Sequence, residues 1–283
     1  MPIEFEAIQY TYPCRLQPAI ADLSLNIPVG KACALIGRNG CGKTTLFRLA
    51  NGLYRPQRGL IRWHGKPLRY QPAVLRQLRR QVGLVFQDPE QQLVATTVEE
   101  DLSYGLCNHD VPVAEIALRV QQALHDFDLV ELATTPVNTL SLGQKRRLAI
   151  ADIAILQPQL LLLDEPLAYL DPPQQRNLCQ ILARLQAAGT TVAIATHDLD
   201  FAAAWADWVF VLDRGQLVIA GAPADIFTAP QFIDLGLGQP LLTTVAQLTT
   251  GEERASMAIA SVQRALWQRY GLSPRELTPF LWN

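Results

Sequence analysis

One eight-residue segment constrains the fold more than any other part of the chain. Residues 37–44 read Gly-Arg-Asn-Gly-Cys-Gly-Lys-Thr and match the pattern G-x-x-x-x-G-K-[ST] in full. The segment joins an apolar run that predicts a buried strand, Ala32–Ile36, to a helical stretch, Thr44–Asn51. In such a unit the glycines let backbone N–H groups converge on phosphate oxygens, and the helix offers its positive end. The sequence therefore predicts a phosphate-binding loop in which Lys43 reaches the β- and γ-phosphates and the Thr44 hydroxyl binds Mg²⁺.

Two carboxylates follow a second apolar strand. Leu160–Leu163 is fully apolar, and Asp164 and Glu165 come directly after it. In open α/β sheets, ligands bind at the edge formed by the carboxyl ends of the strands. Asp164 can help hold Mg²⁺ through its water shell, and Glu165 can orient or deprotonate an attacking water. Two acids at a strand end can also simply meet solvent, but the phosphate loop upstream favours the catalytic interpretation.

Strand-like and helical patterns alternate along the chain. Further strands are predicted at Ile3–Tyr10, Leu23–Ile27, Leu60–Trp63, Val82–Phe86 and Thr191–Ala195. Helical spacing predicts helices at Val98–Cys107, Val113–Phe127, Ser141–Leu156 and Pro172–Ala188. Strands that alternate with helices in this way indicate an α/β fold with a mostly parallel sheet. The 283 residues suggest roughly two structural units, at about 150 residues per domain.

The segment after Gly221 has a different character, because several prolines and glycines interrupt it before a helical pattern begins. The helix predicted at Glu252–Tyr270 carries one apolar stripe, formed by Ala255, Ile259, Val262, Leu266 and Tyr270. About sixty residues are too few for a large independent core. We therefore expect this segment either to pack against the main domain or to contribute a dimer contact.

The formal net charge of -2 hides an uneven distribution. Residues 23–87 contain 12 basic side chains and no acid, whereas residues 88–134 contain ten acids and one base, Arg119. Two interpretations fit this pattern: solvated faces of opposite sign, or a basic phosphate-binding block beside an acidic surface for a partner. The nearly balanced total argues against a globally basic nucleic-acid binder.

The cysteines and the apolar segments indicate the compartment. The five cysteines are odd in number and lack C-x-x-C spacing, which fits a reducing compartment and argues against disulfides or structural zinc. The N-terminus carries acids and no apolar signal-peptide core, and no run approaches the roughly 18 to 20 apolar residues that span a bilayer. We therefore expect a cytosolic chain that forms no membrane pathway by itself.

Further motifs stand in a defined order around these two sites. Residues 140–144 read Leu-Ser-Leu-Gly-Gln, residues 167–171 read Leu-Ala-Tyr-Leu-Asp, and Gln87 and His197 each follow a predicted strand. With these motifs, most of residues 1–220 resembles the nucleotide-binding subunit of an ABC transporter. The resemblance implies a P-loop NTPase fold: an α/β ABC ATPase domain with a RecA-like core, an antiparallel β subdomain and a helical subdomain at about residues 88–156. Residues 221–283 would form a small helical extension, for which dimerisation is one expected role.

The resemblance also implies roles for single residues. Glu165, His197 and Gln87 would be catalytic, with His197 hydrogen-bonded to the γ-phosphate, and Thr44, Gln87 and Asp164 would hold Mg²⁺. An ordinary strand-end glutamine and an ordinary loop histidine are the alternatives for Gln87 and His197. Tyr12 would stack on the adenine, although Tyr10 competes for this role and Tyr12 could instead pack in the core. The residues expected to bind ATP are Tyr12, Gly37, Arg38, Asn39, Gly40, Cys41, Gly42, Lys43, Thr44 and Thr45.

The segment 140–144 resembles the ABC signature, which in this family closes on the ATP of the opposite subunit. The residues expected to do so are Ser141, Leu142, Gly143 and Gln144. Leu142 stands where glycine is usual. If Ser141 is the N-cap, Leu142 occupies the first helical position and needs no positive φ, so we expect weaker closure at most. Asp171 retains the D-loop aspartate, although a leucine begins that motif where serine is common.

Three segments narrow the resemblance to energy-coupling-factor (ECF) importers, which take up vitamins or cobalt and nickel ions. They are residues 85–93, residues 97–101 with Tyr104 and Gly105, and residues 221–227. The implied partners are a second ATPase subunit (an identical copy or a close relative), a transmembrane coupling protein and a separate substrate-binding membrane protein. The implied location is the cytoplasmic face of the membrane. We expect Asp88, Glu90 and nearby carboxylates to receive arginines of the coupling protein, and we expect no nucleic acid as a partner.

Other functions compete with this interpretation. The nearest is the ATPase subunit of another ABC importer or exporter. A DNA-repair or chromosome ABC ATPase would need a long insertion, and only 121 residues separate Lys43 from Asp164. A translation-linked ABC protein would normally have two cassettes. A P-loop kinase for a small metabolite would explain neither the signature-like segment nor His197.

Overall fold

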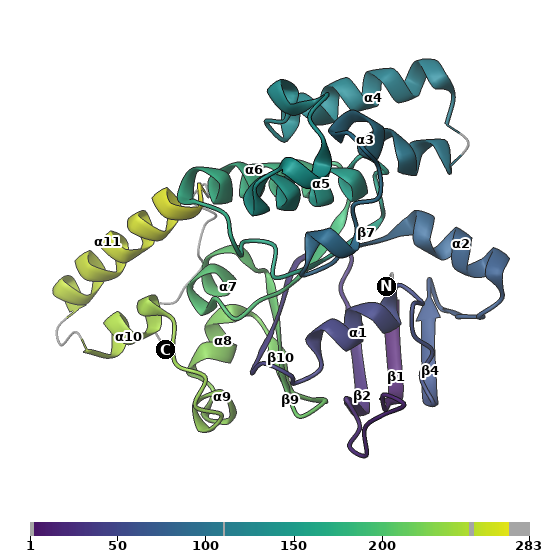
Figure 1. Cartoon of the computed structure of the whole chain (residues 1–283). Helices are drawn as coiled ribbons and strands as arrows, with labels where there is room; N and C mark the ends of the chain where they lie inside the picture. Colours follow the sequence, from purple (N-terminus) through teal and green to yellow (C-terminus); the bar gives the residue numbers. More distant parts are fainter. Residues whose placement is uncertain (1–2, 110, 249–251, 272–283) are drawn as a thin grey trace.

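The central layer of the protein is a six-stranded sheet (Figure 1). The computed structural model describes residues 3–109, 111–248 and 252–271, and the side chains of residues 246–260 lie outside this description. The strand order is β10-β9-β3-β8-β7-β6, and every neighbouring pair is parallel except β10 with β9. The strands are β3 (Ala32–Gly37), β6 (Val82–Val85), β7 (Leu160–Asp164), β8 (Thr191–Ala195), β9 (Trp208–Asp213) and β10 (Gln216–Gly221). The predicted α/β fold with a mostly parallel sheet is confirmed.

Helices cover both faces of this sheet, and β7 shows the consequence for the sequence. The covering helices include α1 (Lys43–Ala50), α5 (Leu142–Ala154), α6 (Pro172–Ala187) and α7 (Leu199–Trp205). Leu160 and Leu162 pack into the core that contains α1, whereas Leu161 and Leu163 pack into the core that contains α5 and α6. A strand that is buried on both faces needs an apolar residue at every position. This is why β7 reads as a continuous run of leucines.

A second, antiparallel sheet packs beside α1, with strand order β2-β1-β4-β5. Its strands are β1 (Ile3–Tyr10), β2 (Ile20–Ile27), β4 (Arg58–Trp63) and β5 (Lys66–Pro67). Leu23, Leu25 and Ile27 are buried and alternate with exposed residues, as expected for a strand with one solvated face. Helix α2 (Pro72–Gln81) then leads directly into β6 of the central sheet.

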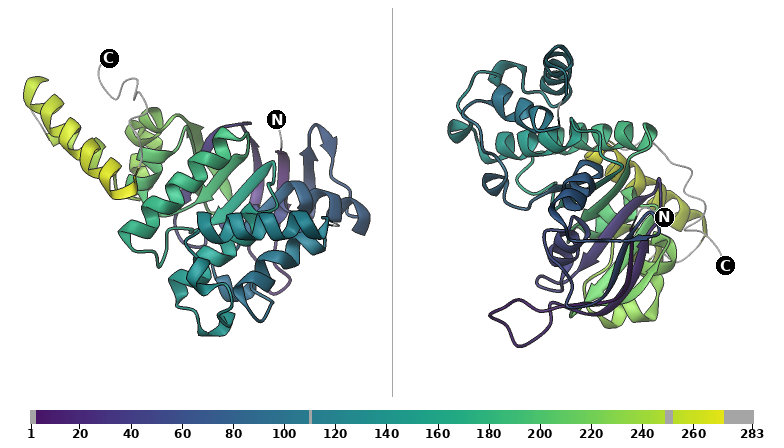
Figure 2. Two further views of the ribbon diagram at one scale, coloured as in Figure 1. Left: turned by 90° about the horizontal axis from the view of Figure 1, so that it is seen from above. Right: turned by 90° about the vertical axis from the view of Figure 1, so that its right-hand side faces the viewer.

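Three helices form a layer to one side of the central sheet, and α5 belongs both to this layer and to the helices that cover the sheet (Figure 2). The three helices are α5, α3 (Val98–Cys107) and α4 (Val113–Asp126), with the short 3-10 turns η1 (Pro89–Gln91), η2 (Val130–Leu132) and η3 (Val137–Thr139) between elements. One apolar stripe of α4 and its C-terminal end packs into this layer, because Val120, Leu124 and Phe127 are buried and Ile116 packs against them.

A pair of acids joins α3 to α5 inside this layer. The Oδ1 atom of Asp101 accepts the backbone N–H groups of Val94 at 2.9 Å and Ala95 at 2.6 Å, and Asp101 is only 4% exposed. The carboxyl group of Asp152 is buried against it. Burial and the neighbouring Asp101 raise the pKa of Asp152 well above its usual range. In the folded chain Asp152 therefore holds its proton to a higher pH than an exposed aspartate does, and it can share this proton with Asp101.

The C-terminal extension packs against the main domain through the end of its last helix. The helices after β10 are α8 (Pro223–Thr228), α9 (Pro230–Asp234), α10 (Leu241–Leu248) and α11 (Glu252–Tyr270). Leu266 and Tyr270 are buried and Val262 packs beside them in the core that includes α6 and α7. The side chains of Ala255 and Ile259, from the same predicted stripe, lie outside the described residues. The rest of α11 extends away from the main body (Figure 2).

We predict that Asp152→Asn stabilises the fold increasingly as pH rises. The unfolded chain releases the Asp152 proton above about pH 4, whereas the folded chain retains it to a higher pH, so folding takes up a proton between the two pKa values. The free energy of unfolding of the parent should therefore fall, relative to that of the variant, by up to about 1.4 kcal/mol per pH unit. Urea unfolding at several pH values between 5 and 8 measures this difference. A pH-independent difference, equal to that of the exposed control Glu131→Gln, would contradict a protonated Asp152.

Candidate functional site

The turn from β3 into α1 needs glycine at both of its ends. Gly37 has a φ of 150°, and a Cβ there would lie 2.1 Å from the carbonyl oxygen of Leu212. Gly42 has a φ of 114°, and a Cβ there would lie 2.6 Å from the carbonyl oxygen of Ala19. Any side chain at these positions would collide with backbone atoms. The glycines therefore allow the loop to pack closely between β9 and the antiparallel sheet.

Lys43 is folded over the loop that precedes it. Its ammonium group donates hydrogen bonds to the carbonyl oxygens of Gly37 at 2.8 Å and Arg38 at 3.3 Å. The residue is only 7% exposed. A mostly buried cation at the N-terminus of a helix is an arrangement that favours an anionic ligand.

The parallel sheet brings Asp164 beside Thr44. β3 and β7 flank β8, so their carboxyl ends lie at the same edge of the sheet. The Thr44 hydroxyl donates a hydrogen bond of 2.5 Å to Asp164 Oδ2. Burial is the main cause that raises the pKa of Asp164, which is 3% exposed, while the Thr44 hydrogen bond and the charge of Lys43 counteract it. The Thr44 hydroxyl and the Asp164 carboxylate thus offer neighbouring oxygen atoms, which are the ligands that Mg²⁺ prefers.

Glu165 and His197 contact each other at the same edge. Glu165 adopts a left-handed backbone with φ 49°, which its N–H group supports by donating to the Ala195 carbonyl at 2.9 Å. Its Oε1 atom lies 3.0 Å from His197 Nδ1, and its Oε2 atom accepts a hydrogen bond of 3.3 Å from the Thr196 hydroxyl. Glu165 is 8% exposed, whereas the side chain of His197 is largely exposed. The carboxylate is thus held in place while the imidazole remains accessible.

A cavity of about 910 Å³ opens over this edge. The predicted residues that line it are Tyr12, Asn39, Gly40, Gly42, Lys43, Thr44, Thr45, Gln87, Asp164 and Glu165. The predicted residues that do not line it are Gly37, Arg38, Cys41, Asp171, His197 and the four residues 141–144. Arg15 and Arg214 also line the cavity, and the sequence analysis missed both because neither stands in a motif. Its size suits a nucleotide.

The two competing tyrosines are placed differently. The hydroxyl group of Tyr12 lies 3.0 Å from the Thr45 hydroxyl oxygen, at the start of α1, and Tyr12 lines the cavity. Tyr10 stacks on Tyr54, with ring centroids 5.0 Å apart, and does not line the cavity. The structure thus favours Tyr12 as the aromatic residue next to a bound base.

The signature-like segment begins α5 as the capping pattern predicts. Ser141 is the N-cap, its side chain accepts the N–H group of Gln144, and the Gln144 side chain accepts the N–H group of Ser141 at 2.8 Å. Leu142 is the first helical residue and has no positive φ, so the backbone geometry expected at this position is confirmed. A Cβ at Gly143 would lie 3.2 Å from the carbonyl oxygen of Tyr169. The signature-like segment is therefore close to residues 167–171, where Asp171 caps α6.

Arg146 connects the signature helix to the segment of Gln87. It is fully buried and donates hydrogen bonds to the carbonyl oxygens of Phe86, at 2.7 Å, and Gln87. Burial lowers the pKa of Arg146, and the negative charge of Asp164 counteracts this effect. The sequence analysis missed this residue, because a helix pattern does not reveal which carbonyl groups a side chain will reach.

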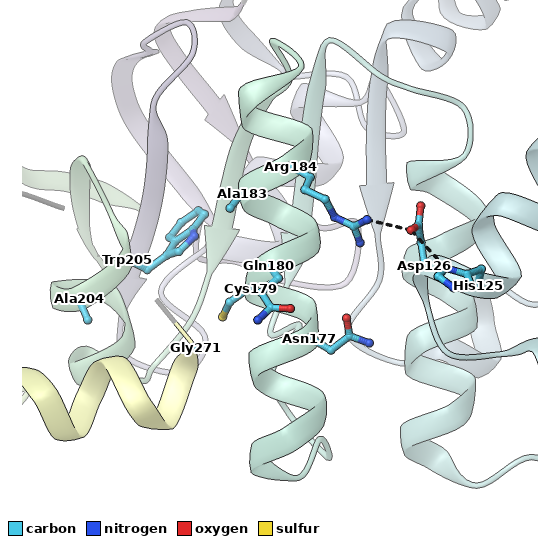
Figure 3. A pocket seen from close by; sticks show the side chains of 10 residues that line it. All are labelled: His125, Asp126, Asn177, Cys179, Gln180, Ala183, Arg184, Ala204, Trp205 and Gly271. Atoms are coloured by element: carbon cyan, nitrogen blue, oxygen red, sulfur yellow. Dashed lines mark hydrogen bonds and ion pairs between the residues drawn. The ribbon is translucent and has the colours of Figure 1, made fainter. Parts of the chain in front are cut away.

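A second cavity, of about 660 Å³, lies between α6 and α7 (Figure 3). The Arg184 guanidinium and the Asp126 carboxylate form an ion pair of 2.8 Å at its wall. Among the described residues that line this cavity, none belongs to the predicted site. The chemistry of the phosphate loop is therefore confined to the larger cavity.

The fold and the larger cavity, which Lys43, Thr44, Asp164 and Glu165 line, define a P-loop nucleotide-binding protein. The sequence pattern of the family described as ABC transporter matches residues 20–168, and the chain belongs to this family. It therefore has the ABC ATPase fold, binds ATP, and couples ATP hydrolysis to transport.

Named relatives extend over most of the chain. The cobalt import ATP-binding protein CbiO of Salmonella paratyphi A is 43% identical over 227 residues, 80% of this chain and 84% of its own. The energy-coupling factor transporter ATP-binding protein EcfA of Carboxydothermus hydrogenoformans is 41% identical over 243 residues, 86% of this chain and 88% of its own. The solved structure of CbiO1 from Clostridium perfringens, part of the ABC transporter complex cbiONQ, is 34% identical, with a TM-score of 0.73 over 90% of this chain and 98% of its own.

We predict that Lys43→Ala weakens ATP binding by about 10- to 100-fold, because a buried charge-assisted contact with the phosphates is lost. Equilibrium titration with a fluorescent ATP analogue measures this change. The control is Lys66→Ala, which removes an exposed lysine on β5 and should leave the affinity unchanged. Equal affinities of the two variants would contradict the role of Lys43.

Proposed function

We propose that this chain is the ATP-hydrolysing subunit of an ECF-type importer for cobalt or nickel ions or for vitamins. The names of the CbiO and EcfA relatives support the importer class. The observation that carries the proposal is the gathering of Lys43, Thr44, Asp164 and Glu165 around one nucleotide-sized cavity. A separate membrane protein would select the cargo, as the resemblance to ECF importers implies.

The nucleotide would bind with its phosphates in the turn between β3 and α1. Backbone N–H groups and the Lys43 ammonium would hold the β- and γ-phosphates, and Tyr12 would lie against the adenine. Mg²⁺, when bound, neutralises phosphate charge, and Thr44, Asp164 and Gln87 supply the oxygen atoms that would hold it. No group of three or more His, Cys, Asp or Glu residues within the described ranges could hold a metal by itself. This fits an ion that is shared with substrate phosphates.

Glu165 is the proposed base for hydrolysis. It would orient a water molecule and accept its proton, while the water oxygen attacks the γ-phosphorus and the bond to the bridging oxygen breaks toward ADP. The contacts from Thr196 and His197 hold both carboxylate oxygens, so little reorientation is needed in the transition state. The exposed face of His197 would hydrogen-bond to the γ-phosphate.

The signature residues would act on a second subunit. Ser141 and Gly143 do not line the cavity of their own chain, although the N–H groups of Leu142 and Gly143 in the first turn of α5 suit an anion. We infer that two ATPase subunits face each other head to tail, so that each signature closes on the ATP of the other. If ATP binds only the closed pair and is present at 100 times its dissociation constant, it stabilises the closed pair by about 2.7 kcal/mol. Loss of the γ-phosphate then reopens the pair. Asp171, which caps α6 beside the signature, would couple the two sites.

Only part of the acidic segment, residues 88–134, is proposed to bind the membrane coupling protein. Several of its acids already have basic partners: Glu90 with Lys145, Glu115 with Arg119, Asp126 with Arg184, and Asp128 with Arg147. Asp88 caps η1, just after Gln87, and Glu90 is largely exposed. We infer that these two acids receive arginines of the membrane coupling protein. The chain would then sit at the cytoplasmic face of the membrane.

No helix within the described part of the chain is both long and apolar enough to cross a bilayer.

We predict that Glu165→Gln keeps ATP binding but lowers the hydrolysis rate by at least about 100-fold, because the amide cannot accept the proton. ATP should then trap the closed pair, which size-exclusion chromatography with ATP detects. The control is Glu131→Gln, an exposed acid on η2. A hydrolysis rate close to that of the parent would overturn the assignment of Glu165.

We predict that Asp88→Ala combined with Glu90→Ala weakens binding to the membrane coupling protein, because two negative charges beside Gln87 are lost. Co-purification of the tagged subunit from detergent-solubilised membranes measures the change at low and at moderate salt. The control removes two exposed acids elsewhere, Asp225→Ala with Asp234→Ala. If both double variants co-purify equally well, the charge-docking proposal fails.

A further inference from the structure

The last turn of α11 reaches the segment that carries His197. Tyr270 is fully buried, and its ring packs edge-on against Phe201 of α7 with centroids 5.3 Å apart. Its hydroxyl group donates a hydrogen bond of 2.8 Å to Asp198 Oδ2. Burial and the charge of Asp198 raise the pKa of Tyr270, so the hydroxyl keeps its proton and remains a donor. A residue near the end of the described chain thus binds the neighbour of His197.

Asp198 passes this contact toward the catalytic edge. Its Oδ1 atom caps α7 by accepting the N–H group of Phe201 at 2.9 Å, which fixes the side chain for Tyr270. Its own N–H group donates 3.1 Å to the Thr196 hydroxyl oxygen. The same hydroxyl donates to Glu165 Oε2 at 3.3 Å. Three hydrogen bonds, joined through the covalent frame of Asp198, therefore lead from Tyr270 to the carboxylate of Glu165.

Burial makes this chain of hydrogen bonds stiff. Tyr270 is 0% exposed, Thr196 3% and Glu165 8%, while Asp198 between them is half-buried, so water has limited access to replace a missing partner. Hydrogen bonds in such surroundings strengthen one another, and an unsatisfied buried group is costly. The loss of one donor at Tyr270 would therefore be felt at the atoms that hold Glu165.

Further contacts hold the C-terminal segment in this position. The N–H group of Leu241 donates 2.7 Å to Asp200 Oδ1, also on α7. The guanidinium group of Arg38, in the phosphate loop, donates 2.5 Å to the carbonyl oxygen of Leu235. Residues after β10 thus contact both the phosphate loop and the helix that follows His197.

We propose that Tyr270 is a positioning residue for ATP hydrolysis: through Asp198 and Thr196 it fixes the orientation of Glu165. The C-terminal extension would then set the turnover rate of the subunit from outside the ATPase domain. This inference rests on the proposed role of Glu165 and adds the group that holds it.

The test compares Tyr270→Phe with the parent in the purified full-length chain. The phenylalanine keeps the ring against Phe201 and removes only the hydrogen bond. We expect kcat to fall about three- to tenfold while KM for ATP stays within about twofold, since no contact with the nucleotide changes. The matched control is Tyr70→Phe, because the buried hydroxyl of Tyr70 has no hydrogen-bond partner among the described residues. All assays run well below the melting temperature of each variant.

A second background tests the route through Thr196. Thr196→Val breaks the chain next to Glu165, so adding Tyr270→Phe should cause no further loss of kcat. If Tyr270 only stabilised the fold, the factors by which Thr196→Val and Tyr270→Phe lower kcat would instead multiply in the double variant. The inference is overturned if the losses multiply, or if Tyr270→Phe matches Tyr70→Phe in kcat. If Glu165→Gln abolishes turnover in that case, the proposed function survives and only the role of Tyr270 falls.

Discussion

The site depends on the parallel pairing of β3, β8 and β7. Parallel strands end at the same edge, so the residues that follow them meet there however far apart they lie in the chain. The 2.5 Å hydrogen bond between Thr44 and Asp164 joins residues that are 120 positions apart. The continuous apolar sequence of these strands fits their burial on both faces. Nucleotide chemistry at this edge is a consequence of how the core is packed.

Arg146 connects the layer formed by α3, α4 and α5 to that edge of the sheet. A fully buried guanidinium group loses its hydration, and here it is compensated by carbonyl oxygens in the segment of Gln87. Because Arg146 belongs to α5, a displacement of Gln87 must move the helix that begins at Ser141, or break these buried bonds. The segment facing the proposed membrane partner and the segment facing the proposed second subunit are therefore tied together.

Local sequence patterns predicted those helices and strands whose caps and apolar spacing can be read from a few neighbouring residues. The bounds of α3 and β8, and the cap of α5 at Ser141, agree with the structure. The site residues that directly follow strands could be predicted for the same reason. β9 and β10 were missed, although the turn at Arg214 and Gly215 between two apolar runs was a usable signal. Long-range partners could not be predicted, because Tyr270 lies 72 positions from Asp198 and no local pattern encodes the contact.

The acidic segment shows why charge along a sequence is a poor guide to charge on a surface. Three of its ten acids pair with bases from beyond the segment, which are Lys145, Arg147 and Arg184. Pairs with exposed members contribute at most about 1 kcal/mol each, so a partner can displace them at little cost. Glu90 is such a member: its side chain is 63% exposed, whereas that of Lys145 is 13% exposed. An incoming arginine could replace Lys145 at Glu90, and Lys145 lies on the helix that begins at the signature. Partner binding at this acid would therefore be transmitted directly to α5.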